Sequence, residues 1–326
     1  AERLVLASDK NVPLLKKVLQ LRAVIANKLG YETWADYRCE VKMAGDGKTA
    51  SDFLMNLKRG LEPKWKAEMA EFTKIKQAET GDPNAIVHMW DIFYYENLYK
   101  KEKFSVDAEQ LRVFFPYEQT LQGMFRVYEE IFRLKIVEAK PDYKWNEKVT
   151  LHLVYDSLSG EPLGALYLDM FPREGKFNHF AMFPLISGKR LPSGHYQRPT
   201  VALICNFPTP GKDKPSLLSH DNVETLFHEF GHALHGILTR TKFSRFAGTS
   251  VPRDFVEAPS QMLENWIWDK TVLDAFAADY RDPSVKIPQS VLDKLQEAKK
   301  ATIARHYRRQ LSYGLVDLGL HTLSAD

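Results

Sequence analysis

The chain has 326 residues, of which 44% are hydrophobic and 12% aromatic, enough to bury a sizeable core in about two domains or lobes. A net charge of +3 is too small to indicate a nucleic-acid partner, and no stretch approaches the roughly 18–20 apolar residues that span a membrane. Two cysteines, Cys39 and Cys205, are too few for a disulfide framework and suit a reducing compartment. We expect a cytoplasmic monomer with no nucleic-acid or membrane partner.

The first part of the chain, residues 1–145, has the periodicity of helices. Apolar residues recur three and four positions apart, and Gly-Asp turns separate the periodic segments. We expect helices over residues 12–29, 50–79, 86–100, 105–114 and 121–134.

A small β-sheet region is expected over residues 146–210, because the period changes after Lys140-Pro141-Asp142. Alternating or β-rich runs separated by Gly and Pro predict strands over residues 149–155, 164–170, 177–183 and 200–206. We expect this sheet to line a cleft, where an extended peptide can pair with an exposed strand edge. The alternative is a sheet that only supports the helix that follows it.

The next helix is expected from Asp221 to Leu238, where apolar residues form a stripe. Asp221 is the expected N-cap, and Glu224 falls three positions later, as in a capping box. Gly231 costs about 1 kcal/mol of helix stability relative to Ala. A glycine there predicts that another part of the chain approaches the helix closely.

This helix carries the motif His228-Glu229-Phe230-Gly231-His232. Histidines four positions apart share one face of a helix, so each can offer a ring nitrogen to one zinc ion at about 2.0–2.1 Å. Glu229 projects beside the metal, where it can take a proton from a zinc-bound water. Random placement of ten histidines gives this pattern in roughly one such chain in fifty, so we favour one Zn²⁺ site.

The third zinc ligand must come from elsewhere in the chain. His235 lies a rise of about 10 Å from His228, too far for both to join His232 on one ion, and we expect it at the cleft wall or behind the ligands. A second helix is expected from Glu257 to about Tyr280. Glu257 and Glu264 share a face of it, and their spacing leaves open which binds zinc and which orients a ligand imidazole.

Two segments carry a family resemblance. Residues 227–235 and 253–266 closely resemble the family of thimet oligopeptidase, neurolysin and oligopeptidase A, as do residues 167–176 and Asn206-Phe207 more briefly. The resemblance implies a mainly α fold with a small β-sheet (α+β), the zincin-like catalytic region of a two-lobed helical oligopeptidase. It also implies zinc on His228, His232 and Glu257, with Glu229 as the catalytic base and Glu264 supporting the site.

The resemblance further implies a zinc metalloendopeptidase that degrades short peptides in a deep cleft between helical lobes. Residues 211–326 then hold the zinc-binding helices. Members of the family also carry an N-terminal helical lobe and a downstream glycine-rich segment with substrate-binding tyrosines, and nothing here matches either. We therefore expect an internal fragment, truncated after Asp326. Two alternatives are a fragment that binds zinc but cleaves weakly or not at all, and a non-catalytic helical interaction module.

Overall fold

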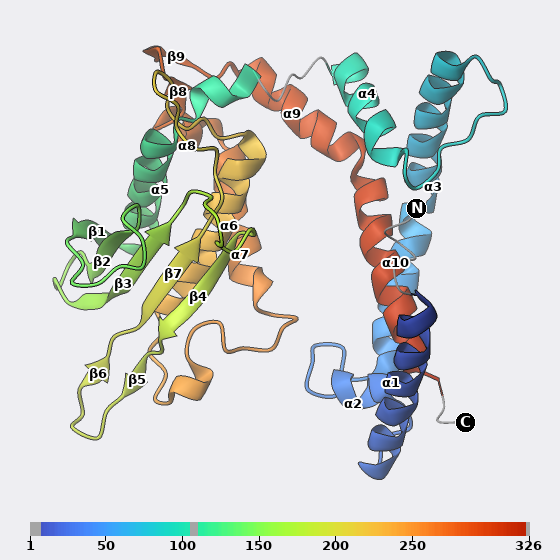
Figure 1. Ribbon diagram of the computed structural model, residues 1–326, viewed down its shortest axis with the longest axis horizontal. Coiled ribbons are helices and arrows are strands. Elements are labelled where there is room, and N and C mark those ends of the chain that lie inside the picture. The colour runs from blue at the N-terminus through green and yellow to red at the C-terminus, as the bar shows by residue number, and fades with distance from the viewer. Residues whose placement is uncertain (1–7, 105–109, 324–326) are drawn as a thin grey trace. The chain divides into compact units, whose positions relative to one another are not determined.

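The computed structural model describes residues 8–104 and 110–323, and these are mainly helical with a small sheet (Figure 1). This confirms the predicted fold class. By their contacts the residues form two compact units, one of residues 1–106 with 294–326 and one of residues 107–293. The predicted divisions after residues 145 and 210 mark where the chain changes from helices to strands and then back to helices. The units follow packing instead, which joins the helix that ends at Phe132 to the strands after it.

The first unit is built from helices. They are α1 (Ser8–Lys28), α2 (Trp34–Cys39), α3 (Gly47–Thr80), α4 (Ile92–Phe104), the second part of α9 (Gln289–Ala301) and α10 (Ile303–His321). In Figure 1, α10 lies along α3, where the buried Glu68 carboxylate accepts the backbone N–H groups of Ala304 and Arg305 at 3.1 and 2.7 Å. A carboxylate at the start of α10 binds its unpaired N–H groups and complements the helix dipole.

A five-stranded sheet is the centre of the second unit, in the order β1-β2-β3-β7-β4. Its strands are β1 (Leu134–Ala139), β2 (Thr150–Asp156), β3 (Pro162–Asp169), β4 (Ala181–Ile186) and β7 (Thr200–Ile204). Neighbours are antiparallel except for β3 and β7, which are parallel. The predicted strands correspond to β2, β3, β4 and β7, with β4 beginning four residues late. The sequence analysis missed β1 and the short pairs β5 (Lys189–Arg190) with β6 (Tyr196–Gln197) and β8 (Ala278–Asp279) with β9 (Asp282–Lys286).

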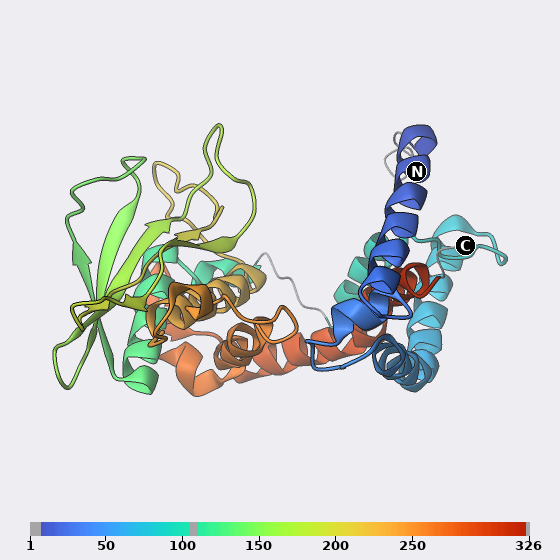
Figure 2. The same cartoon turned by 90° about the horizontal axis from the view of Figure 1, so that it is seen from below.

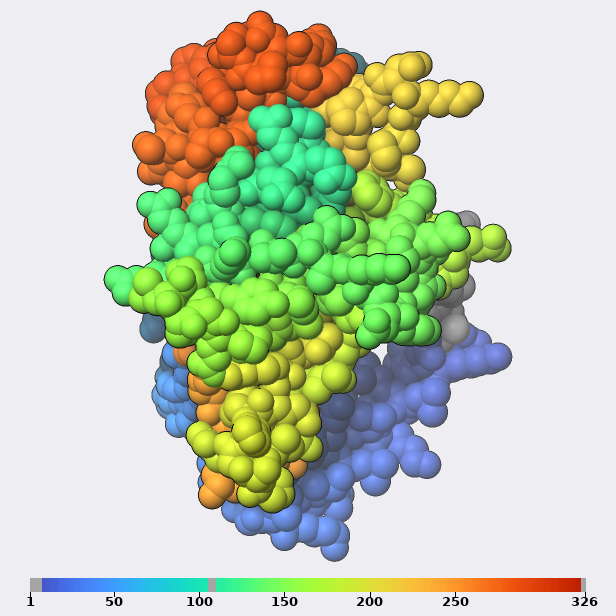
Figure 3. All heavy atoms as spheres, turned by 90° about the vertical axis from the view of Figure 1, so that its left-hand side faces the viewer, coloured from blue at the N-terminus to red at the C-terminus, as the bar shows by residue number. Residues whose placement is uncertain are grey.

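Helices α5 (Tyr117–Phe132) and α6 (His220–Ile237) pack on one face of this sheet (Figure 2). Tyr128 of α5 is fully buried, and its ring lies 5.1 Å from that of Phe230 on α6. Phe125 contacts both Phe230 and His152 of β2, so aromatic rings join the two helices to the sheet. From the side of the sheet, Figure 3 shows strand residues, in green and yellow, at the surface.

Strand β4 forms one edge of the sheet, since its only partner strand is β7. It contains Pro184, and its register shifts between Pro184 and Ile186. Proline lacks the N–H that a central strand must donate, so it is confined to edges and bulges. The sequence of β4 therefore fits its place.

The second predicted helix, residues 257–280, was wrong in its length. The structure has α7 (Glu257–Glu264), a 3-10 turn (Asn265–Trp268) and α8 (Lys270–Asp274). Asp269 interrupts the helix because its side chain accepts the N–H groups of Thr271 and Val272 as the N-cap of α8.

Two shorter 3-10 turns lie at Gln110–Phe114 and Ser244–Phe246. Of the helix predicted over residues 105–114, the first five residues lie outside the described ones, and the rest form the first of these turns. Across residues 8–104 and 110–323, no helix is both long enough and apolar enough to cross a bilayer.

Candidate metal centre

Helix α6 begins at His220, one residue before the predicted start, and the predicted N-cap was wrong. Ser219 caps it: its hydroxyl accepts the Asn222 N–H at 3.1 Å, and the Asn222 side chain accepts the Ser219 N–H at 3.2 Å. Glu224, which was expected to complete the capping box, instead accepts the indole N–H of Trp268 at 3.1 Å.

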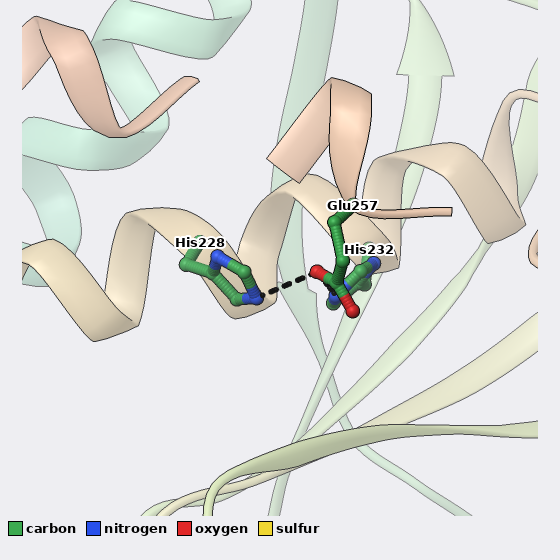
Figure 4. A group of neighbouring side chains, drawn as sticks. All are labelled: His228, His232 and Glu257. Carbon is green, nitrogen blue, oxygen red and sulfur yellow. Dashed lines mark ion pairs between the residues drawn. The ribbon is translucent and has the colours of Figure 1, made fainter. Parts of the chain in front are cut away.

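His228, His232 and Glu257 converge between α6 and α7 (Figure 4). Both histidines project from one face of α6, and Glu257 reaches them from the start of α7. Its Oε2 atom lies 3.2 Å from Nε2 of His228 and 3.1 Å from Nε2 of His232. Within the described residues this is the group of side chains whose ligand atoms could share a metal ion.

Glu264 contacts the other nitrogen of His228. Its Oε1 atom lies 2.6 Å from Nδ1, on the side of the ring away from Glu257. This hydrogen bond raises the pKa of His228, although burial opposes it. In the neutral ring, a proton on Nδ1 that is donated to Glu264 leaves the lone pair on Nε2, where a metal can bind.

The crossing of α6 and α7 depends on Gly231. A Cβ at this position would lie 2.8 Å from the Cα of Ser260, so only glycine fits. The close approach predicted at Gly231 is therefore confirmed. It also buries Ser260, whose hydroxyl lies 3.0 Å from both the backbone oxygen and Oε2 of Glu257.

Ser260 is a site residue that the sequence analysis missed. Its spacing of three from Glu257 was the available signal, since such residues are neighbours on a helix.

Glu229 follows His228 on α6 and is buried, with only 8% of its surface exposed. Burial raises its pKa, and the charge of Glu257 adds to this, while the charge of His228 lowers it. A buried carboxyl with a raised pKa can hold and release a proton nearer neutral pH than an exposed one.

His235 lies about one turn beyond His232 on α6. It lines a cavity of about 420 Å³ between α6, α7 and the loop after α6, with apolar walls that include Leu234, Leu238 and Met262. Burial lowers the pKa of His235. Its Nδ1 atom is buried and has no hydrogen-bond partner among the described residues. The structure thus separates His235 from the three converging side chains, none of which lines this cavity.

Two of the three distances between the converging atoms are close to those that a tetrahedral metal requires. Two ligands bound at about 2.1 Å in tetrahedral geometry lie about 3.4 Å apart. The two Nε2–Oε2 distances, 3.2 and 3.1 Å, are close to this value. Two imidazole nitrogens and one carboxylate oxygen are also a donor set that zinc favours.

The three side chains could together hold a metal ion, and two of them belong to an HExxH motif. The model of peptidase family M3 matches residues 4–326, and the chain therefore belongs to this metallopeptidase family. Family membership implies a metal cofactor.

Similar proteins include saccharolysin of Saccharomyces cerevisiae, with 40% identity over 97% of this chain, and a thimet-like oligopeptidase of Dictyostelium discoideum, with 35% identity over 96%. Oligopeptidase A of Escherichia coli is 36% identical over 95% of the chain. These alignments cover 46%, 48% and 45% of the three relatives, so the chain spans about half their length.

Proposed function

We propose that the chain carries the metal centre of a zinc-dependent peptidase that hydrolyses bonds in short peptides. The observation that carries the proposal is the convergence of two Nε2 atoms and one carboxylate oxygen on α6 and α7. Nitrogen and oxygen donors at tetrahedral spacing favour zinc over magnesium or calcium, which prefer oxygen alone.

His228, His232 and Glu257 would hold the ion. When bound, zinc supplies Lewis acidity that polarises the scissile carbonyl and makes water a better nucleophile near neutral pH. Glu264 orients the His228 ring through Nδ1, and Ser260 orients the Glu257 carboxylate. Glu257 keeps a half-exposed side chain, which leaves access for a substrate.

Glu229 is the proposed general base. It takes the proton from the attacking water and delivers it to the departing amine. Burial supports this role because it raises the pKa of the carboxyl. His235 is a weaker candidate for contact with the substrate or the oxyanion. Its buried Nδ1 has no hydrogen-bond partner among the described residues.

The edge of β4 is the proposed guide for the peptide main chain. Strand β4 contacts α6, the helix that carries Glu229, so a peptide paired with the outer edge of β4 lies beside that helix. Main-chain pairing tolerates many side chains, which suits the oligopeptidases to which the chain is similar. A cytoplasmic location and a monomeric state remain predictions.

A second candidate is a zinc-binding chain with little or no peptidase activity. It rests on the same three side chains, because His228, His232 and Glu257 would hold a metal ion whether or not other groups stabilise the oxyanion. Loss of a single oxyanion donor typically costs about 10²–10³ in turnover.

The test measures zinc content and cleavage of a short quenched peptide, with Glu229→Gln as the matched variant. We expect one zinc per chain in both proteins, cleavage by the parent that a chelator abolishes, and a loss of about 10²–10⁴-fold in the variant. Zinc without cleavage by the parent supports the second candidate. A chain that binds no zinc excludes both, and equal rates for parent and variant exclude Glu229 as the base.

A further inference from the structure

A second contact joins α6 to the chain after α7, beyond the one between Glu264 and His228. The indole N–H of Trp268 donates to Oε1 of Glu224 at 3.1 Å. Trp268 ends the 3-10 turn that continues α7, four residues after Glu264. Glu224 lies four residues before His228, one turn earlier on the same side of α6. The two side-chain contacts therefore lie next to each other between the same two segments of chain.

The start of α7 is held separately. Ser260 packs against Gly231, where no Cβ fits, and Glu257 lies against both histidines. With only eight residues, α7 is too short to be stable alone and takes its position from such contacts. Glu264 is its last residue, so the place of this carboxylate depends on what holds the turn that follows.

Trp268 attaches that turn to the first turn of α6. The centre of its ring lies 4.3 Å from that of His220, which is buried, and Nε2 of His220 lies 3.4 Å from the backbone oxygen of Ile267. Ile267 is itself fully buried. Packing of this kind keeps water out without fixing one geometry, whereas the indole hydrogen bond sets a distance and an angle to α6.

We propose that Trp268 is a positioning residue for the metal centre. Its hydrogen bond to Glu224 fixes the end of α7, and so holds the Glu264 carboxylate against Nδ1 of His228. The effect on zinc binding rests on the proposed function, but the effect on the contact between Glu264 and His228 does not. A merely structural tryptophan would stabilise the unit without acting through Glu264.

The test is Trp268→Phe, which keeps an aromatic ring beside His220 and removes the indole N–H. Glu224 is only partly buried, so water can solvate its carboxylate in this variant. We expect zinc affinity, titrated against a competing chelator, to fall by about three- to ten-fold, as for the loss of one hydrogen bond. In the metal-free protein, NMR should show the Nδ1 proton of His228 exchanging with water about five-fold faster or more.

Trp266→Phe is the matched control, because it makes the same change two residues earlier in the same turn. It should alter neither zinc affinity nor proton exchange at His228. Glu224→Gln keeps an oxygen that can accept the indole N–H, and should retain most of both properties. Equal effects of Trp266→Phe and Trp268→Phe would overturn the proposal.

A double-variant cycle separates positioning from a general loss of stability. If Trp268 acts through Glu264, Trp268→Phe should lower zinc affinity by less than about two-fold once Glu264→Gln is present. Losses that multiply in the double variant would overturn the proposal. If Trp268→Phe does not fold, Glu224→Ala takes its place in both experiments, and unchanged proton exchange at His228 then overturns the proposal. A parent chain that binds no zinc refutes the proposed function, while the proton exchange still decides this inference.

Discussion

Histidines on neighbouring turns of α6 lie in opposite surroundings. His228 and His232 meet carboxylates from α7. About one turn further along, His235 faces an apolar cavity, and its buried Nδ1 has no hydrogen-bond partner among the described residues. The residue type and the helix are the same, so the difference comes from α7. Carboxylates orient an imidazole and support a metal ion, whereas an apolar wall only removes its solvent.

The largest expected effect is the difference in zinc affinity between variants of His232 and His235. His232→Ala removes a proposed metal ligand, while His235→Ala removes a ring outside the converging group. We expect the first to lower zinc affinity by more than about 100-fold and the second to leave it within a few-fold. Titration against a competing chelator measures both. Equal losses of zinc affinity in the two variants would place His235 at the metal and contradict the distinction between the two surroundings.

Glu264→Gln tests how much zinc binding depends on the orientation of the His228 ring. The amide keeps the shape of the side chain but removes the charge that polarises His228. We expect zinc affinity to fall by about 10–100-fold, less than for His232→Ala. The same titration applies, with circular dichroism to establish that helix content is retained. An unchanged affinity would mean that the 2.6 Å contact does not support the metal site.

Gly231→Ala tests the crossing that brings α7 to α6. The new Cβ would lie 2.8 Å from a backbone atom of Ser260, which cannot rotate away. We expect a loss of about 1–3 kcal/mol in the free energy of unfolding of this unit, with weaker zinc binding. Gly60→Ala, in helix α3 with no atom within 4 Å of its Cβ, is the control and should stabilise its unit by up to about 1 kcal/mol. Urea unfolding distinguishes the two.

The smallest expected effect is on the pH dependence of stability in the metal-free protein, where His228 and His235 should contribute with opposite signs. Glu264 raises the pKa of His228, so its contribution to stability is present below about pH 6.5 and is lost as the pH rises through the folded value. Burial lowers the pKa of His235, so its contribution is present above about pH 6.5 and is lost as the pH falls.

Urea unfolding between about pH 5 and 8, with a chelator present, measures these contributions as differences from the parent. Glu264→Gln should destabilise most at acid pH, and His235→Leu should reduce the acid sensitivity. Differences of the same sign would contradict the assignment of the two environments.

Sequence periodicity predicted most of the expected helices and four of the five strands of the central sheet, but not β1. It failed where a single polar side chain outweighed the pattern. Asp269 restarts a helix inside an apolar-periodic run, and Ser219 caps α6 in place of Asp221. Which of two neighbouring residues caps a helix depends on which side chains are buried. Burial is decided by tertiary packing, which the local sequence does not reveal.

More of the candidate site than of the surrounding fold could be predicted from the sequence. The motif placed His228, Glu229 and His232 on one helix, and the resemblance added Glu257. Their spacing left Glu257 and Glu264 interchangeable. The structure puts Glu257 against both Nε2 atoms and Glu264 against Nδ1 of His228.

Pro184 has a consequence for how molecules of this protein meet each other. The edge strand β4 presents apolar side chains, with Phe183, Leu185 and Ile186 each 40–50% exposed. Such an edge is a template on which a second molecule can add a strand and begin to aggregate. A proline in the middle of the strand and the register shift after it break the row of donors that a long intermolecular ladder requires. The edge can pair with a short peptide while resisting polymerisation.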